Sequence, residues 1–271
     1  MQILDIINTA ARAAEGFADG LRHAFTSAVI LAGGTGTRMG AVGPDGRPLT
    51  KQFMELDGEP VILRTIRQFD RASCIDELIL VIREEEKTRY PALLRGAGLQ
   101  KPVKLTVGGA TRQESAEAGL RAVSDKCRFL AIHDGARPLI TPAQIEAVAK
   151  EAYRIGAAAA ASRAKDTVKL TDGNGFVEQT PDRENVWNAA TPQIFKVEEY
   201  RAAVYEGKQS GVKVTDDCSL AEAVGFPVRM VDVGYQNLKI TTKEDLAFAH
   251  AILALRAEEA EKTERSGGKN V

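Results

Sequence analysis

The stretch Leu31-Ala-Gly-Gly-Thr-Gly-Thr-Arg-Met39 decides the fold, because it directly continues the short apolar run Ala28-Val-Ile-Leu31. An apolar run that ends in glycines predicts a buried strand followed by a turn. Glycines at 33, 34 and 36 lack the Cβ atoms that would keep the backbone away from a ligand, and they permit positive φ. Successive N–H groups can then point at phosphate oxygens, so the turn predicts a phosphate-binding loop.

Two cations accompany this loop: Arg38 lies within it, and Lys51 follows in Thr50-Lys-Gln-Phe53. A planar guanidinium suits bidentate contact with phosphate, and an ammonium acts as a point charge. The pattern is not a Walker A loop, since no lysine directly follows the glycines, and Gly40 comes one residue too late for the dinucleotide fingerprint. A turn that needs glycines for steric reasons alone is the alternative, and the paired cations favour phosphate binding.

The order Leu-Ala-Gly-Gly-x-Gly-x-Arg-Met, followed by Lys-Gln-Phe, resembles a known group of enzymes. These are the nucleotidyltransferases that activate sugar or polyol phosphates on a glycosyltransferase-A-like sheet, and their cytidylyltransferases in particular. The resemblance implies a Rossmann-like α/β fold and a nucleoside triphosphate as co-substrate.

Composition limits the classes of function. A chain of 271 residues is long enough for one large α/β domain, and a formal net charge of −1 gives no bulk electrostatic reason to expect nucleic acid or a membrane surface as partner. Cys74, Cys127 and Cys218 are odd in number and lack a Cys-x-x-Cys spacing, which favours neither a disulfide framework nor a zinc site. We therefore expect a cytoplasmic protein that acts on small molecules.

Residues 1–26 precede the first strand and are predicted to form an appended amphipathic helix, because small or apolar side chains recur at alternating spacings of four and three. Acidic and basic residues interrupt any secretory core, and no uncharged run is long enough to cross a bilayer. We expect the apolar stripe to pack on the domain or on a second copy of the chain. The stripe consists of Ile3, Ile7, Ala10, Ala14, Phe17, Leu21 and Ala24.

From residue 27 to residue 261, apolar β-branched runs alternate with helical patterns. This alternation predicts a mostly parallel central sheet covered by helices on both faces. Residues 262–271 are predicted to be a flexible tail. Strands are predicted near 28–32, 78–82, 103–107, 129–133, 156–162, 228–232 and 237–241, and helices near 60–71, 84–95, 112–124, 142–154 and 242–261.

Residues 164–185 are predicted to project from the sheet as a β-arm. Two polar runs, 166–170 and 176–180, flank Asp172-Gly-Asn-Gly175, a sequence that favours a hairpin turn. A two-stranded ribbon is marginally stable alone, so we expect a second subunit to support it.

A second glycine turn, Val107-Gly-Gly-Ala-Thr-Arg-Gln-Glu-Ser115, is expected at the same edge of the sheet as the first loop. Its glycines would let a flat base approach the backbone, and Ser115 offers a hydroxyl to a base edge. An ordinary helix start with a solvated Ser115 is the alternative.

The run Ile132-His-Asp-Gly-Ala-Arg-Pro138 ends a predicted strand in an acid, a glycine and an arginine. Asp134 is the candidate ligand of Mg²⁺ or the candidate partner of a ribose. We expect His133 to be structural, because a phosphate nucleophile is already ionised near neutral pH and needs no base. Arg137 is expected to pair with Asp134 or another local carboxylate.

His-Asp-Gly-Ala-Arg-Pro narrows the resemblance to the 2-C-methyl-D-erythritol 4-phosphate cytidylyltransferase family of the non-mevalonate isoprenoid route. The chain also contains segments similar to the family's remaining motifs, and the resemblance covers about residues 27 to 255. These segments are Asp166-Thr167, Arg183–Gln193, Thr215-Asp-Asp217 and Asn237-Leu-Lys-Ile-Thr241.

Carried over residue by residue, the resemblance implies a site for CTP and Mg²⁺ and a site for the polyol phosphate. In the family the arm crosses to the neighbouring subunit of a homodimer, so Thr167 and Arg183 would serve the partner's site. CTP contacts are implied for Ala32, Gly33, Gly34, Thr35, Gly36, Gly109, Arg112, Ser115, Asp134 and Gly135. Substrate contacts are implied for Thr167, Arg183, Thr215 and Lys239, and the expected catalytic cations are Arg38, Lys51, Lys239 and Arg183.

The chain departs from the family pattern in two places: the link 40–49 is longer than usual, and Ala110 stands where an acid is often found. The expected reaction is transfer of CMP from CTP to 2-C-methyl-D-erythritol 4-phosphate with release of pyrophosphate. The alternatives are a cytidylyltransferase for ribitol 5-phosphate or another polyol phosphate, and a sugar-nucleotide-binding module without catalysis. Such a module should have lost at least one of Arg38, Lys51, Asp134 and Lys239, and all are present.

Overall fold

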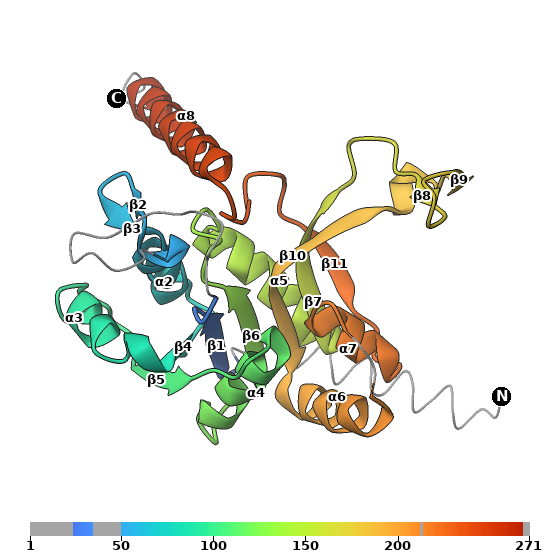
Figure 1. Ribbon diagram of the computed structural model, residues 1–271. Helices are drawn as coiled ribbons and strands as arrows, with labels where there is room; N and C mark the ends of the chain where they lie inside the picture. The colour runs from blue at the N-terminus through green and yellow to red at the C-terminus, as the bar shows by residue number, and fades with distance from the viewer. Residues whose placement is uncertain (1–23, 35–49, 212–213, 268–271) are drawn as a thin grey trace.

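A seven-stranded sheet forms the centre of the protein, as shown by a computed structural model that describes residues 24–34, 50–211 and 214–267 (Figure 1). Neighbouring strands pair in parallel, except that β10 runs antiparallel to both of its neighbours. The mostly parallel sheet expected from the sequence is therefore confirmed. From edge to edge the order is β11 (Arg229–Asp232), β7 (Ala157–Arg163), β10 (Trp187–Lys196), β6 (Phe129–Asp134), β1 (Thr26–Leu31), β4 (Glu77–Ile82) and β5 (Val103–Val107).

Alternation along β1 shows why helices cover both faces. Ala28 and Ile30 belong to one buried cluster, and Val29 between them belongs to a second cluster on the opposite face. The first face packs against α2 (Val61–Arg71), α3 (Arg89–Arg95) and α5 (Pro142–Ile155). The second face packs against α4 (Arg112–Ala122), α6 (Val197–Ser210) and α7 (Asp217–Ala223).

A third, smaller cluster fastens the carboxyl-terminal helix α8 (Lys243–Gly267) to the short hairpin of β2 (Glu55–Leu56) and β3 (Glu59–Pro60). Within the described residues, no helix is both long enough and apolar enough to span a membrane. In the part of the chain that the structure describes, 3₁₀ turns complete the elements: η2 (Lys51–Phe53), η3 (Glu84–Glu86) and η4 (Arg183–Asn185).

The alanine run after Gly156 is a strand, as predicted. Gly156 ends α5 with a φ of 101°, a conformation that favours glycine. Strand β7 then lies between β10 and β11, and residues 157–161 are buried. Small side chains fit there because helices and strands approach β7 from both sides.

Several predicted boundaries were wrong. Residues 237–241 do not form a strand, because the Asn237 side chain turns inward to donate to the Thr191 carbonyl and only Ile240 N bonds another backbone segment, at Ala136 O. The predicted helix 84–95 divides into η3 and α3, and α8 continues past residue 261 to Gly267. Strand β10 and helices α6 and α7 were not predicted. The proposed helix at 1–26 lies outside the described residues up to position 23.

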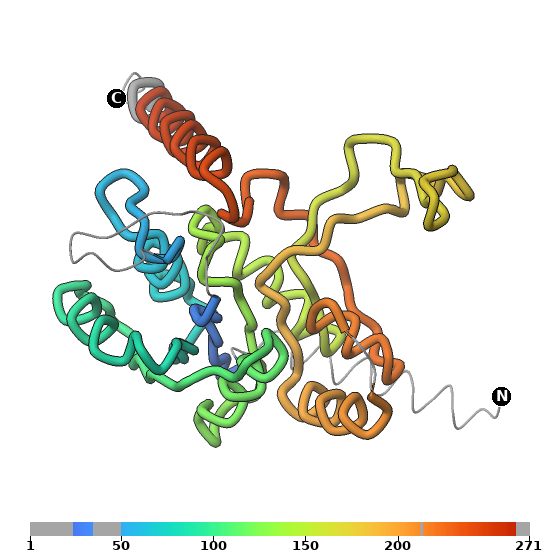
Figure 2. The backbone as a smooth tube through the Cα atoms, in the orientation of Figure 1, coloured from blue at the N-terminus to red at the C-terminus, as the bar shows by residue number. Residues whose placement is uncertain are grey.

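The predicted arm is present as a separate ribbon of β8 (Leu170–Thr171) and β9 (Val177–Gln179) that stands clear of the main sheet in Figures 1 and 2. Asp172 Oδ1 accepts hydrogen bonds from the backbone N–H groups of Asn174 and Phe176 and so closes the turn. Leu170, Phe176 and Val177 are 48%, 74% and 57% exposed, so the arm leaves apolar side chains uncovered within the single chain.

Candidate active site

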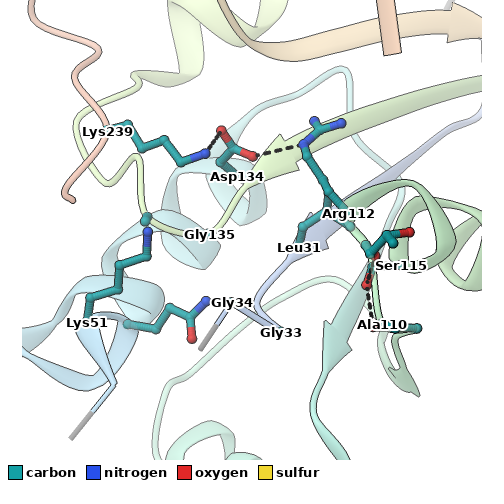
Figure 3. A pocket seen from close by; sticks show the side chains of 14 residues that line it. Leu31, Gly33, Gly34, Lys51, Ala110, Arg112, Ser115, Asp134, Gly135 and Lys239 are labelled. Atoms are coloured by element: carbon teal, nitrogen blue, oxygen red, sulfur yellow. Dashed lines mark hydrogen bonds and ion pairs between the residues drawn. The ribbon is translucent and has the colours of Figure 1, made fainter. Parts of the chain in front are cut away.

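A pocket opens at the carboxyl ends of the central strands, where the chain has turned from one half of the sheet to the other. Strand β1 lies between β4 and β6, and Leu31 at its end pairs with Val81 and with Asp134. Ligands of open α/β sheets bind at such a switch point. The pocket is lined by Leu31, Gly33, Gly34, Lys51, Gln52, Gly109, Ala110, Thr111, Arg112, Ser115, Asp134, Gly135, Ala136 and Lys239 (Figure 3).

Gly135 shows why this edge requires glycine. A Cβ atom at this position would lie 2.7 Å from Ile62 Cδ1 and 2.9 Å from the Leu31 carbonyl oxygen. The second contact is with backbone and cannot be relieved by a rotamer change, and Gly135 N donates to that same carbonyl. A side chain here would push the ends of β1 and β6 apart and deform the pocket.

Lys51 reaches the pocket from η2, and the packing of Phe53 in the same turn holds η2 in place. Gln52 beside it is 2% exposed and also lines the pocket. Phe53 packs edge-on against Tyr90, with ring centroids 5.2 Å apart, and the Arg89 guanidinium lies 3.7 Å from the Phe53 ring centroid. A short turn held by a buried aromatic side chain presents the lysine in a defined place.

Asp134 is the electrostatic centre of the pocket. Its carboxylate lies 3.0 Å from Lys239 Nζ, 3.3 Å from Arg137 Nε and 3.5 Å from Arg112 Nε. Burial by itself raises the pKa of this carboxyl, but Lys239, Arg112 and Arg137 together hold the pKa well below its usual range. Asp134 is therefore ionised and gathers cations from three separate segments at one point. Figure 3 shows two of them, Lys239 and Arg112, on either side of the carboxylate.

Arg112 links Asp134 to the neighbouring helix α7. Its Nη1 atom donates to Asp217 Oδ2 at 2.7 Å, and the Tyr200 hydroxyl donates to Asp217 Oδ1 at 2.7 Å. Desolvation lowers the pKa of Arg112, but Asp217 and Asp134 outweigh it and raise the pKa above its usual value. The guanidinium is thus fixed between two carboxylates at the start of α4.

The second glycine turn meets the pocket at the start of α4. Thr111 and Glu114 form a capping box, which satisfies the first amides of the helix. A Cβ at Gly108 would lie 2.6 Å from Ser115 Oγ, so the turn packs tightly on this hydroxyl. Ser115 Oγ donates to the Thr111 carbonyl at 2.9 Å, and the residue is 8% exposed and lines the pocket.

His133 is structural in the sense predicted. Its Nε2 atom faces the Arg137 carbonyl at 3.3 Å and must donate there, so Nδ1 accepts from the Thr191 hydroxyl at 3.1 Å. Thr191 Oγ1 in turn accepts from Asp134 N. Complete burial lowers the pKa of His133 to about 3, and the neutral ring serves to hold the Asp134 turn. The predicted pairing of Arg137 with Asp134 is confirmed.

The pocket brings together most of the described candidates. Ala32 is buried behind the lining, Thr215 lines a neighbouring hollow, and Thr167 and Arg183 lie on the arm and its root. Thr35, Gly36 and Arg38 lie outside the described residues. The predicted residues that line the pocket are Gly33, Gly34, Lys51, Gly109, Arg112, Ser115, Asp134, Gly135 and Lys239.

Two functional positions were missed in the sequence. Gln52, within the Lys-Gln-Phe motif, lines the pocket. The sequence does not show that this glutamine is buried, so its place in the pocket could not be predicted. Asp217 holds Arg112 from α7, and the pair of acids Asp216-Asp217 was the available signal. Asp216 caps α7 and also accepts a hydrogen bond from the Gln193 side chain.

Among the described residues that line the pocket, Asp134 contributes the single carboxylate. In the part of the chain that the structure describes, no group of three or more His, Cys, Asp or Glu side chains could hold a metal ion. This donor set does not form a protein cage. It does fit Mg²⁺, which usually keeps several waters and is bound through one or two carboxylates and substrate phosphates.

A glycine-lined pocket with converging cations, at the switch point of a mostly parallel sheet, defines an α/β protein that binds a phosphate-bearing nucleotide. Residues 26–255 match the model of the family described as IspD: 2-C-methyl-D-erythritol 4-phosphate cytidylyltransferase. The chain belongs to this family.

Relatives agree with this assignment. An enzyme of that name from Geobacillus kaustophilus is 42% identical over 232 residues, which cover 86% of this chain and 98% of the relative. An enzyme of the same name from Desulforamulus reducens is 41% identical over 230 residues, which cover 84% of this chain and 96% of the relative. The crystal structure of 4-diphosphocytidyl-2C-methyl-D-erythritol synthase from Anaerococcus prevotii has a TM-score of 0.76 at 32% identity, and covers 86% of this chain and 100% of that one.

Proposed function

We propose that this protein transfers CMP from CTP to 2-C-methyl-D-erythritol 4-phosphate, giving 4-diphosphocytidyl-2-C-methyl-D-erythritol and pyrophosphate. The observation that carries the proposal is the convergence of Lys239, Arg112 and Arg137 on Asp134 inside a glycine-lined pocket, in a chain of the cytidylyltransferase family. The substrate phosphate attacks the α-phosphorus of CTP, an oxygen–phosphorus bond forms, and the bond to the pyrophosphate oxygen breaks. Such chemistry depends on positioning and on charge stabilisation.

The chain's own groups supply both. The amides after β1 and the Lys51 ammonium face the triphosphate, and the turn at Gly109 accepts the cytosine with Ser115 beside it. Lys239 lies across the pocket and stabilises charge that develops on the α-phosphate. Arg38 is assigned the same role from its place in the sequence.

Mg²⁺ belongs to this proposal as the partner of the triphosphate, with Asp134 as the protein ligand. When bound, the ion neutralises phosphate charge. Asp134 is suited to this role because it remains ionised among its cations. Its removal should therefore weaken metal-dependent nucleotide binding.

The active form is proposed to be a homodimer in the cytoplasm. Thr167 and Arg183 flank the projecting ribbon of β8 and β9, and the exposed Leu170, Phe176 and Val177 of this ribbon need a covering surface (Figure 1). A crossed arm in a symmetric dimer would cover these side chains and bring Arg183 to the substrate phosphate of the neighbouring site.

The test is a matrix of nucleotides and polyol phosphates incubated with the purified protein and Mg²⁺, with pyrophosphate release as readout. We expect rapid release only for CTP with 2-C-methyl-D-erythritol 4-phosphate. Faster release with ribitol 5-phosphate would replace the substrate assignment. Nucleotide binding without release in any combination would favour a non-catalytic module.

A further inference from the structure

Five contacts at the root of the arm form a closed chain of interactions that the reaction proposed above does not use. We name Arg163, Lys165, Arg183, Trp187 and Tyr235 the arm-root cluster. These residues come from the end of β7, the arm, η4, the start of β10 and the loop after β11. The arm leaves the sheet at this point (Figure 2).

Arg183 joins the cluster through one hydrogen bond. Its Nη1 atom donates to the Lys165 carbonyl at 3.1 Å. This bond occupies one of the five N–H donors of a guanidinium and fixes the direction of the fork. The orientation of Arg183 therefore depends on where the Lys165 backbone lies.

Tyr235 contacts the outgoing strand of the arm at Lys165 and at Arg163. The Lys165 ammonium lies 3.4 Å from the centroid of the Tyr235 ring, and the Tyr235 hydroxyl donates to the Arg163 carbonyl at 3.0 Å. Tyr235 thus contacts the two residues that flank Ala164, the backbone of Arg163 and the side chain of Lys165. Tyr235 is 47% exposed, so filling the core does not account for it.

Arg163 closes the cluster on the returning strand. Its guanidinium carbon lies 4.4 Å from the Trp187 ring centroid, and its Nη1 atom donates to the carbonyl of Glu184 at 3.1 Å. Glu184 follows Arg183 directly in the sequence. The Arg163 side chain therefore joins the outgoing strand of the arm, on which it lies, to the returning strand next to Arg183.

We propose that Tyr235 is a positioning residue for the reaction: through Lys165 and Arg163 it sets the direction of the arm and thereby places Arg183 against the substrate phosphate. The proposal rests on the proposed function and on the crossed arm. Tyr235 belongs to the loop that also carries Lys239, so one loop would serve its own site through Lys239 and the partner's site through the arm.

The first experiment compares Tyr235→Phe and Tyr235→Leu with Tyr205→Leu, a matched control at a tyrosine that is 63% exposed on α6. Loss of one neutral hydrogen bond should raise KM for the polyol phosphate about threefold, and loss of the ring as well about tenfold. KM for CTP and the folded fraction should stay unchanged. An unchanged KM for the polyol phosphate in Tyr235→Leu would overturn the proposal.

A second experiment distinguishes an effect of Tyr235 through the arm, on the partner's site, from an effect through the loop, on its own site. Two heterodimers are purified through different tags, each with one site silenced by Lys51→Ala. If Tyr235 acts through its own arm, KM rises when Tyr235→Leu and Lys51→Ala share a chain, because the live site then receives the altered arm. KM stays normal when the two changes are on different chains. The reverse result, or a rise in both heterodimers, contradicts the proposal.

Hydrogen exchange separates failure of this inference from failure of the proposed function. Ala164 N bonds Val186 O, and Val186 N bonds Arg183 O, so these amides report on the root without any substrate. They should exchange about tenfold faster in Tyr235→Leu and unchanged in Tyr205→Leu. Unchanged exchange at both amides in Tyr235→Leu would overturn the positioning role even if the enzyme were fully active.

Discussion

Lys239 Nζ lies 3.0 Å from Asp134 Oδ2, so a loop that follows the last strand delivers its cation to the carboxyl end of β6. These residues are far apart in the sequence, and the sheet alone brings them together. Replacing Asp134 by asparagine removes the only charge that Lys239, Arg112 and Arg137 share at this point. We expect a loss of about 2 kcal/mol in the free energy of unfolding and weaker Mg²⁺-dependent CTP binding.

Denaturant unfolding and calorimetric titration measure the two effects of Asp134→Asn. Asp172→Asn is a suitable control, since that carboxylate lies on the exposed arm turn. Wild-type stability together with wild-type CTP affinity would show that Asp134 is not the electrostatic centre of the pocket.

Lys51→Ala and Arg38→Ala are each expected to lower turnover about a hundredfold or more, while CTP affinity changes much less. The reason is that both cations are assigned to charge that develops in the transition state. Steady-state kinetics and equilibrium CTP binding give the two quantities. Normal turnover with a large loss of affinity would assign these residues to ground-state binding instead.

The protein should select CTP over UTP and over purine nucleotides. The part of the pocket that we assign to the base is lined by Gly109 and Ser115, whose backbone and hydroxyl groups suit the edge of a small pyrimidine. Competition among the triphosphates in the pyrophosphate assay checks this. Comparable kcat/KM for ATP or GTP would contradict the assignment of the base site.

Acid should destabilise the protein through His133. Its pKa is about 3 in the folded chain and about 6.5 when unfolded, so the unfolded state binds the extra proton between these values and stability falls as pH falls. This residue alone should cost about 2 kcal/mol between pH 7 and pH 5. The slope of unfolding free energy against pH should be shallower in His133→Gln, and equal slopes would mean that the ring is not held neutral.

Crossed arms predict complementation between inactive chains. Mixed dimers of Arg183→Ala with Lys51→Ala contain one composite site with both native residues, so about half of wild-type turnover should return. Each variant alone should stay nearly inactive. If mixed dimers form and turnover does not return, Arg183 acts within its own chain.

The sequence predicted the parallel half of the fold because its strands are continuous apolar runs bounded by glycine turns, such as Ala28–Leu31. It did not reveal β10, because Pro192 and the register shift between Ala189 and Gln193 interrupt the strand pattern. Residues 237–241 alternate like a strand, but the inward turn of Asn237 decides their structure.

Part of the candidate site could likewise be predicted from the sequence, and part could not. Local motifs with a backbone requirement, such as Gly135 or the Thr111 cap, can be read from neighbouring residues. The bond of Arg112 to Asp217 and the contact of Lys165 with Tyr235 depend on tertiary packing, so no local sequence pattern predicts them.

The most direct test of the central claim follows the phosphorus atoms of CTP. Protein, Mg²⁺ and 2-C-methyl-D-erythritol 4-phosphate are incubated with CTP labelled at the α-phosphate or at the γ-phosphate, and the products are separated. Attack at the α-phosphorus predicts that the α-label enters 4-diphosphocytidyl-2-C-methyl-D-erythritol and the γ-label leaves as pyrophosphate. Recovery of the γ-label in the polyol product, or of the α-label as free CMP, would contradict the account.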